Sequence, residues 1–137
     1  MFKIHLGHLL IVFIGANSAW AQSPVGWEEL SQEGRAPEAY SLAKQQVHGA
    51  KKEFYLGVLA FHAKQWDESI TWLTQALSVN KEMTDYIYLY RGQDLMAKGE
   101  SQKALDDFKK AEQLSHLKFV SEIARFYQAE IYQNIKE

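Results

Sequence analysis

The sequence predicts an all-α protein in which about seven helices form a solenoid of helical hairpins after a signal peptide. Three observations predict this fold class. The first residues have the layout of a secretory signal peptide, a long stretch recurs at an offset of 35 residues, and apolar residues elsewhere follow helical spacing. With 137 residues, the chain is long enough for one small domain.

The amino terminus carries the three parts of a signal peptide. Lys3 comes first, an apolar run follows over residues 6–16, and small residues at Ala19 and Ala21 close the segment. We expect residues 1–21 to be the signal peptide, with cleavage after Ala21. The apolar run is shorter than the ~20 residues that span a bilayer, so an uncleaved anchor is the less favoured alternative. No cysteine follows, which excludes a lipoprotein, and an exported chain without cysteine fits a bacterial periplasm.

Composition excludes several classes of function. The net charge of −2 offers no electrostatic footprint for nucleic acid. Without cysteine the chain has no disulfides, no thiolate zinc site and no cysteine nucleophile. The five histidines form no H-x-x-x-H pair, so we expect no metal and no cofactor.

An internal repeat organises the rest of the chain. Four pairs of positions are related by the same offset of 35 residues: Gly57 and Gly92, Ser69 and Ala104, Leu73 and Phe108, and Ala76 and Ala111. This conserved spacing indicates one two-helix unit that is used twice. A single hairpin cannot bury its apolar face, so the units are expected to stack.

The repeated residue types suggest how the two helices of a unit meet. Gly57 is expected to face Ser69, and Gly92 to face Ala104, because small residues allow two helix axes to approach closely. The larger residues are expected to fill the space where the helices diverge; they are Leu73, Leu95 and Phe108.

These residues resemble the tetratricopeptide repeat, a helix–turn–helix of about 34 residues. The second unit matches at Gly92, Leu95, Gly99, Ala104, Phe108 and Ala111, and the first at Leu56, Gly57, Ala60, Trp66, Leu73 and Ala76. Departures from the family pattern are Ser69 for alanine, Lys81 and His116 for a closing proline, and Arg91 for an apolar residue. The resemblance implies a right-handed solenoid whose concave groove binds a protein or peptide.

The flanks follow the same period. Residues 22–49 are expected to form an amino-terminal half-repeat, residues 50–118 two repeats, and residues 119–137 a capping helix or the start of a further unit. The predicted helices span residues 25–33, 37–48, 51–63, 67–79, 84–97, 101–114 and 119–135. The run YIYLY at residues 86–90 has the composition of a strand, but the repeat predicts that it is helical.

The repeat phase also predicts which residues line the groove. They are Lys51, Phe54, Val58, Phe61 and His62 from the first unit, Tyr86, Leu89, Tyr90, Gln93 and Met96 from the second, and Val120, Ile123 and Tyr127 from the last helix. This aromatic and apolar face predicts an interaction site. The alternative is that neighbouring helices or a missing part of the chain cover it. The positions that match a carboxylate clamp for chaperone tails are Phe54, Val58, Tyr90, Val120 and Ala124; none is polar, so no clamp is expected.

The segment HAKQWDESITW, residues 62–72, looks at first like an active site. Its polar residues fall at a hairpin turn, where Asp67 and Glu68 suit the start of a helix and Ser69 lies at the helix crossing. Packing and capping therefore explain the segment, and no catalytic residue is expected. A structural or solvated role is also favoured for His62, although its place beside Phe61 keeps it a candidate ligand contact.

Two functions remain open. The first is a non-catalytic periplasmic scaffold that binds a protein or peptide, with no nucleic acid and no stable membrane span after cleavage. The second follows from a similarity to the helical amino-terminal region of soluble lytic transglycosylases, through the export signal and the repeats FYLGVLAFHAKQWDESI and DYIYLYRGQDLMAKGESQKAL. That resemblance implies a scaffold bound to peptidoglycan or to a cell-wall enzyme. We expect such a scaffold to lack the lysozyme-like catalytic domain of that family.

Overall fold

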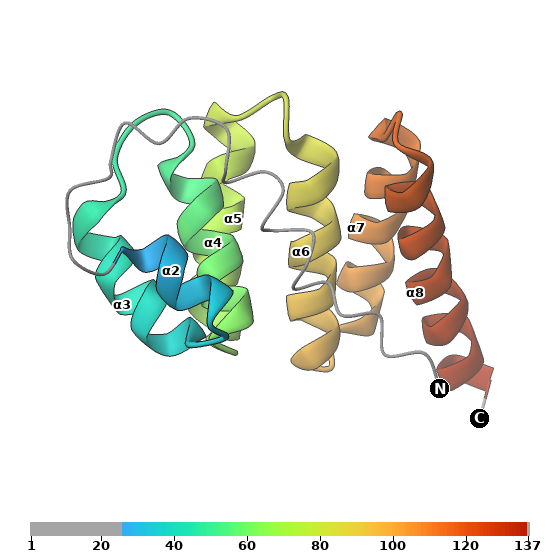
Figure 1. The fold of residues 1–137 in the computed structure, drawn as a ribbon. Coiled ribbons are helices and arrows are strands. Elements are labelled where there is room, and N and C mark those ends of the chain that lie inside the picture. Colours follow the sequence, from blue (N-terminus) through green and yellow to red (C-terminus); the bar gives the residue numbers. More distant parts are fainter. Residues whose placement is uncertain (1–25, 137) are drawn as a thin grey trace.

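The computed structural model describes residues 26–136, and within them it is all-helical with no strand (Figure 1). The seven helices are α2 (Trp27–Gln32), α3 (Ala36–Gln46), α4 (Lys52–His62), α5 (Trp66–Val79), α6 (Thr84–Ala97), α7 (Ser101–Leu114) and α8 (Lys118–Lys136). The prediction of an all-α fold with about seven helices is confirmed, and each boundary agrees within two residues. The predicted signal peptide, its cleavage after Ala21 and the start of the first predicted helix lie outside the described residues.

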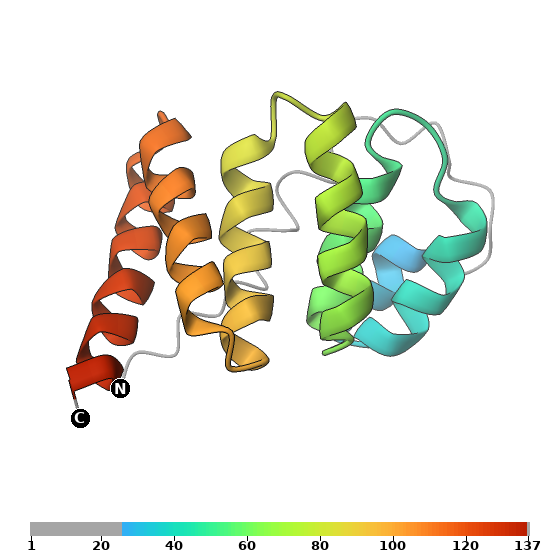
Figure 2. The same cartoon turned by 180° about the vertical axis from the view of Figure 1, so that it is seen from behind.

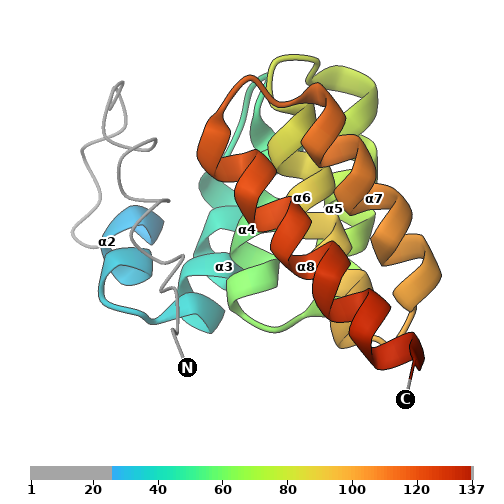
Figure 3. The ribbon, with the colours of Figure 1, turned by 90° about the vertical axis from the view of Figure 1, so that its right-hand side faces the viewer.

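Each helix packs against the next one along the chain (Figures 1 and 2). Two further contacts skip one helix, from α4 to α6 and from α6 to α8. These contacts place α4, α6 and α8 beside one another in one layer, while α5 and α7 form the other. Figure 3 looks onto α8, which ends the array.

Three hairpin turns share one backbone geometry. The turn residue has a positive φ in each: 77° at Gly34, 59° at Lys64 and 77° at Gly99. Each turn also repeats a pair of backbone hydrogen bonds to carbonyls three and five residues earlier, donated by Gly34 and Arg35, Lys64 and Gln65, and Gly99 and Glu100. This is the Schellman type of helix ending, which usually has glycine at the left-handed position. The pairs α2–α3, α4–α5 and α6–α7 are therefore joined by the same type of turn.

The glycines inside the two longer hairpins touch large side chains. A Cβ atom at Gly57 would lie 2.7 Å from two side-chain carbons of Leu73, and one at Gly92 would lie 2.7 Å from the ring of Phe108. The expectation that Leu73 and Phe108 fill space where the helices diverge is therefore wrong. Both lie directly on the glycine, because a residue four positions after the small one shares its helix face.

Two apolar clusters form the core, and α4 contributes to both. Leu56, Leu59 and Ala60 face α2 and α3, where Tyr40 is also buried. The opposite side of α4 joins the larger cluster, which runs through α5, α6, α7 and α8. The run at residues 86–90 lies within α6, so its predicted helical state is confirmed.

Candidate functional site

Most of the predicted groove is filled by its own side chains. Seven of its residues are buried, with at most 9% of their surface exposed: Phe54, Val58, Tyr86, Leu89, Tyr90, Gln93 and Val120. Phe61, His62, Met96, Ile123 and Tyr127 are partly exposed, and Lys51 is exposed. The contacts of α6 with α4 and α8 close the middle of this face. Only its margins offer surface to a ligand.

Aromatic rings gather at the end of α4. Phe61 meets His62, Trp66 and Tyr90 edge-on, with ring centroids 5.1, 5.9 and 5.1 Å away. His62 also lies 6.2 Å from the ring of Tyr90. These four residues, called the aromatic cluster below, come from α4, the first residue of α5, and α6. Tyr90 is buried beneath the cluster, whereas the other three remain partly exposed.

His62 is the polar member of the aromatic cluster. Its Nε2 atom is buried and has no hydrogen-bond partner among the described residues. Burial lowers the pKa of His62 below its usual value, so the imidazole is neutral at pH 7. A neutral imidazole nitrogen can donate or accept one hydrogen bond, depending on the tautomer. The aromatic cluster therefore offers apolar ring edges with no fixed charge, while the Nε2 atom of His62 lies buried beneath its surface.

Other residues of the segment 62–72 bind neighbouring helices. The indole Nε1 of Trp72 donates to the hydroxyl of Tyr40 at 2.9 Å, and that hydroxyl donates to the carboxylate of Glu68. Burial, followed by the hydrogen bond to Glu68, raises the pKa of Tyr40 to about 12. These bonds join α5 to α3. Asp67 forms an ion pair with Lys98 at the end of α6.

A buried polar chain crosses between the hairpins at Asp94, which sequence reasoning missed. The Ser69 Oγ atom lies 2.6 Å from Oδ2 of Asp94 and 2.9 Å from the carbonyl oxygen of Gly57. A hydroxyl has one proton, yet both neighbours are acceptors when Asp94 is ionised. Both bonds form together when a protonated Asp94 donates to Ser69 and Ser69 donates to Gly57.

The surroundings of Asp94 favour this neutral form. The side chain is 0% exposed, and its Oδ1 atom has no partner within the described residues. Burial raises the pKa of Asp94 to about 7, against a smaller lowering by the Ser69 hydrogen bond. The offset of 35 places Asp94 at the position of Leu59, which is buried in the first unit. The sequence feature that could have identified Asp94 is therefore an acidic residue at a position where the other repeat has a buried apolar one.

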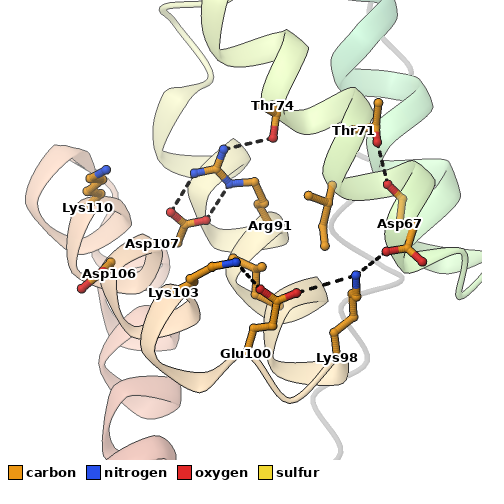
Figure 4. A pocket seen from close by; sticks show the side chains of 12 residues that line it. Asp67, Thr71, Thr74, Arg91, Lys98, Glu100, Lys103, Asp106, Asp107 and Lys110 are labelled. Carbon is orange, nitrogen blue, oxygen red and sulfur yellow. Dashed lines mark hydrogen bonds and ion pairs between the residues drawn. The ribbon is translucent and has the colours of Figure 1, made fainter.

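A hollow of about 490 Å³ lies between α5, α6 and α7 (Figure 4). Its charged lining consists of Asp67, Arg91, Lys98, Glu100, Lys103, Asp106, Asp107 and Lys110. Arg91 forms a two-pronged ion pair with Asp107 at 2.7 and 2.9 Å, and it also donates to Thr74 at 3.1 Å. The departure of Arg91 from the repeat pattern is thus explained by a carboxylate on α7.

The remaining charges of this hollow also largely cancel. Lys98 pairs with Asp67 and Glu100, and Glu100 pairs in turn with Lys103 (Figure 4). The four basic side chains are balanced by four acidic ones. The lining of the hollow therefore has no net charge that would favour a cation or an anion.

Among residues 26–136, no group of three or more histidine, aspartate or glutamate side chains is placed to hold a metal ion. None of the helices in that range is long and apolar enough to cross a membrane. No model of a protein family matches the chain, and no curated protein or solved structure matches it either.

Proposed function

We propose that this protein is a non-catalytic binding module built as a right-handed solenoid of tetratricopeptide-like hairpins. The repeated turn geometry at Gly34, Lys64 and Gly99 supports this architecture. The close approach of a large side chain to Gly57 and to Gly92 supports it further. Exposed faces on stacked hairpins are where solenoid proteins bind their partners.

The observation that carries the binding proposal is the aromatic cluster. His62 and Trp66 meet the ring of Phe61 edge-on, and all three side chains are partly exposed. Aromatic residues dominate the binding energy of many protein interfaces because they bury large areas with few rotatable bonds. The ligand is a peptide segment of a partner protein, with an apolar side chain placed against the rings.

We further propose that the protein acts after export, in the periplasm. The support is the layout of residues 1–21, which lie outside the described residues, together with the absence of cysteine. A periplasmic module could also associate with the cell wall, so peptidoglycan forms a separate arm of the test.

The test measures binding of the protein produced from the full-length gene to a displayed library of random peptides and to purified peptidoglycan. His62→Leu and Trp66→Leu remove the polar atom and the largest ring while keeping apolar volume. We expect selected peptides to bind the parent protein and to lose about tenfold or more in affinity with either variant.

Val79→Ser is the matched control, because Val79 is 58% exposed at the far end of α5. This control should bind like the parent, and the thermal melts of all variants should confirm that they fold. Peptide binding that is unchanged by His62→Leu and Trp66→Leu contradicts the site. Retention on peptidoglycan without any selected peptide contradicts the peptide proposal and favours the cell-wall function.

A further inference from the structure

The last helix has an exposed face that no other described helix covers. The outward stripe of α8 consists of Glu122, Phe126, Ala129, Gln133 and Lys136, all of them exposed. Phe126 is the large apolar residue of this stripe, and 61% of it is accessible. Its described ring contact is the edge of the neighbouring Tyr127, at 5.5 Å.

The repeat shows why α8 differs from the helices that begin the earlier hairpins. The buried residues of α8 match those of α6 at an offset of 34: Val120 matches Tyr86, Ser121 matches Ile87, and Ala124 matches Tyr90. This offset places Phe126 at the position of Gly92, whose bare backbone receives the ring of Phe108 from the following helix. A helix that packed on α8 as α7 packs on α6 would collide with the ring of Phe126. A further helix of the same kind therefore does not fit on this face.

We infer that two copies of this chain pair through α8, with the two helices antiparallel and crossing at Ala129. The stripe residues follow one another by four, three, four and three positions, which is the seam spacing of paired helices. Ala129 lies at the centre of the stripe, where a small side chain lets two helices approach. The pairing is symmetric, with the same surface on both copies.

Charge selects the antiparallel direction. Around a twofold axis at Ala129, Glu122 of one copy faces Lys136 of the other, and this pairing occurs twice. A parallel pair would instead place Glu122 against Glu122 and Lys136 against Lys136, which is repulsive. The antiparallel register also brings Phe126 opposite Gln133 and Tyr132, and Tyr132 is 45% exposed. The stripe is therefore complementary to itself.

A contact made by one helix from each copy is small, so the dimer is expected to be weak, with a Kd on the order of 10 to 100 µM. Analytical ultracentrifugation of the protein produced from the full-length gene should show reversible dimers in this range. Phe126→Glu should weaken the dimer tenfold or more. Val79→Glu, a change of the same kind at a site of similar exposure on α5, should leave it unchanged.

A charge swap tests the direction and register. Glu122→Lys and Lys136→Glu should each weaken the dimer about three- to tenfold, and the variant with both changes should recover most of the loss. Far-UV circular dichroism and thermal melting should show that every variant folds, since the changed side chains are exposed.

A protein that stays monomeric up to about 1 mM overturns the inference, because another partner must then cover the face. Equal weakening by Phe126→Glu and Val79→Glu overturns it as well. Failure of the double charge swap to recover the dimer excludes the antiparallel pairing at Ala129. Each outcome is independent of peptide binding at the aromatic cluster, which is read out by the peptide library.

Discussion

The hairpins α4–α5 and α6–α7 solve the same packing problem with different side chains. Both place a large residue on a glycine, Leu73 on Gly57 and Phe108 on Gly92. Elsewhere the offset of 35 pairs unlike residues: Leu56 and Trp72 of the first hairpin become Arg91 and Asp107 in the second, and Lys64 becomes Gly99. Both hairpins thus keep a large side chain packed on a glycine, whereas other matching positions change between apolar and charged residues.

The difference shows which positions the hairpin geometry demands. A glycine under a large side chain cannot vary, because no space exists for a Cβ atom. An apolar pair can give way to an ion pair when the two charges satisfy each other, as Arg91 and Asp107 do. Four substitutions test this difference between the hairpins, in order of decreasing expected effect on stability.

Gly92→Leu should be the most damaging change. The new side chain must displace the ring of Phe108, which is fully buried, so we expect a loss of about 4 kcal/mol or more from a stability of roughly 5–15 kcal/mol. Chemical denaturation measures the loss. Ala97→Leu, at the exposed last residue of the same helix, is the control and should change stability little. A Gly92→Leu variant that melts like the parent would contradict the helix packing.

Asp94 should make stability depend on pH. Its pKa is about 7 when folded and about 4 when unfolded, so the folded state retains a proton that the unfolded state releases between these values. The contribution of Asp94 to the free energy of unfolding is fully present below about pH 4 and is lost as pH rises, by about 4 kcal/mol above pH 7.

Asp94→Asn keeps the shape of the side chain and removes its titration. Relative to the parent, the variant should gain stability steadily as pH rises from 5 to 8, measured by thermal melting at each pH. The comparison isolates Asp94 from other titrating groups, including His62, whose lowered pKa has the opposite effect: its contribution is lost as pH falls. A difference that stays constant with pH would rule out the buried neutral acid.

Arg91→Leu gives the second hairpin the residue that the first has at the matching position, Leu56. It leaves the buried carboxylate of Asp107 unpaired, so we expect a loss of about 2 kcal/mol in denaturation experiments. Adding Asp107→Leu should recover most of that loss, because an apolar pair again replaces a charged one. If the double variant is no more stable than Arg91→Leu alone, an apolar pair cannot replace the ion pair at these two positions.

Lys64→Gly should have the smallest effect and should stabilise the protein. Lys64 adopts a φ of 59° in a turn whose counterparts, Gly34 and Gly99, are glycines. Relief of this strain should add about 0.5 kcal/mol, partly offset by the greater freedom of glycine in the unfolded chain. Lys109→Gly, at an exposed position inside α7, is the control and should destabilise. A loss of stability in Lys64→Gly would show that the turns are not equivalent.

Much of the fold could be predicted because helical spacing is a local property. The positions related by the offset of 35 placed the helices from α4 to α7 and the turns between them. The same pattern predicted that YIYLY is helical despite its strand-like composition, and this is confirmed. It also predicted that small residues accompany the crossings, and the bond from Ser69 to Gly57 agrees.

The site was less predictable, because burial depends on what neighbouring units bring. Phe54, Val58 and Leu89 lie on the predicted groove face, yet contacts between α4, α6 and α8 bury them. Asp94 could be recognised as an acid at an apolar position, but its partner Ser69 lies 25 residues earlier. A periodic pattern identifies which face of a helix points inward. It does not state how completely the next helix covers that face.

The sequence by itself determined an all-α chain with repeated hairpins, since residue spacing within one helix sets its period and its turns. Only the tertiary structure decided that Asp94 is sealed from water, that Arg91 meets Asp107, and that Phe126 remains exposed on α8. Each of these outcomes depends on side chains brought together or kept apart by packing between helices. Their energies come from burial and desolvation, which arise when the helices assemble.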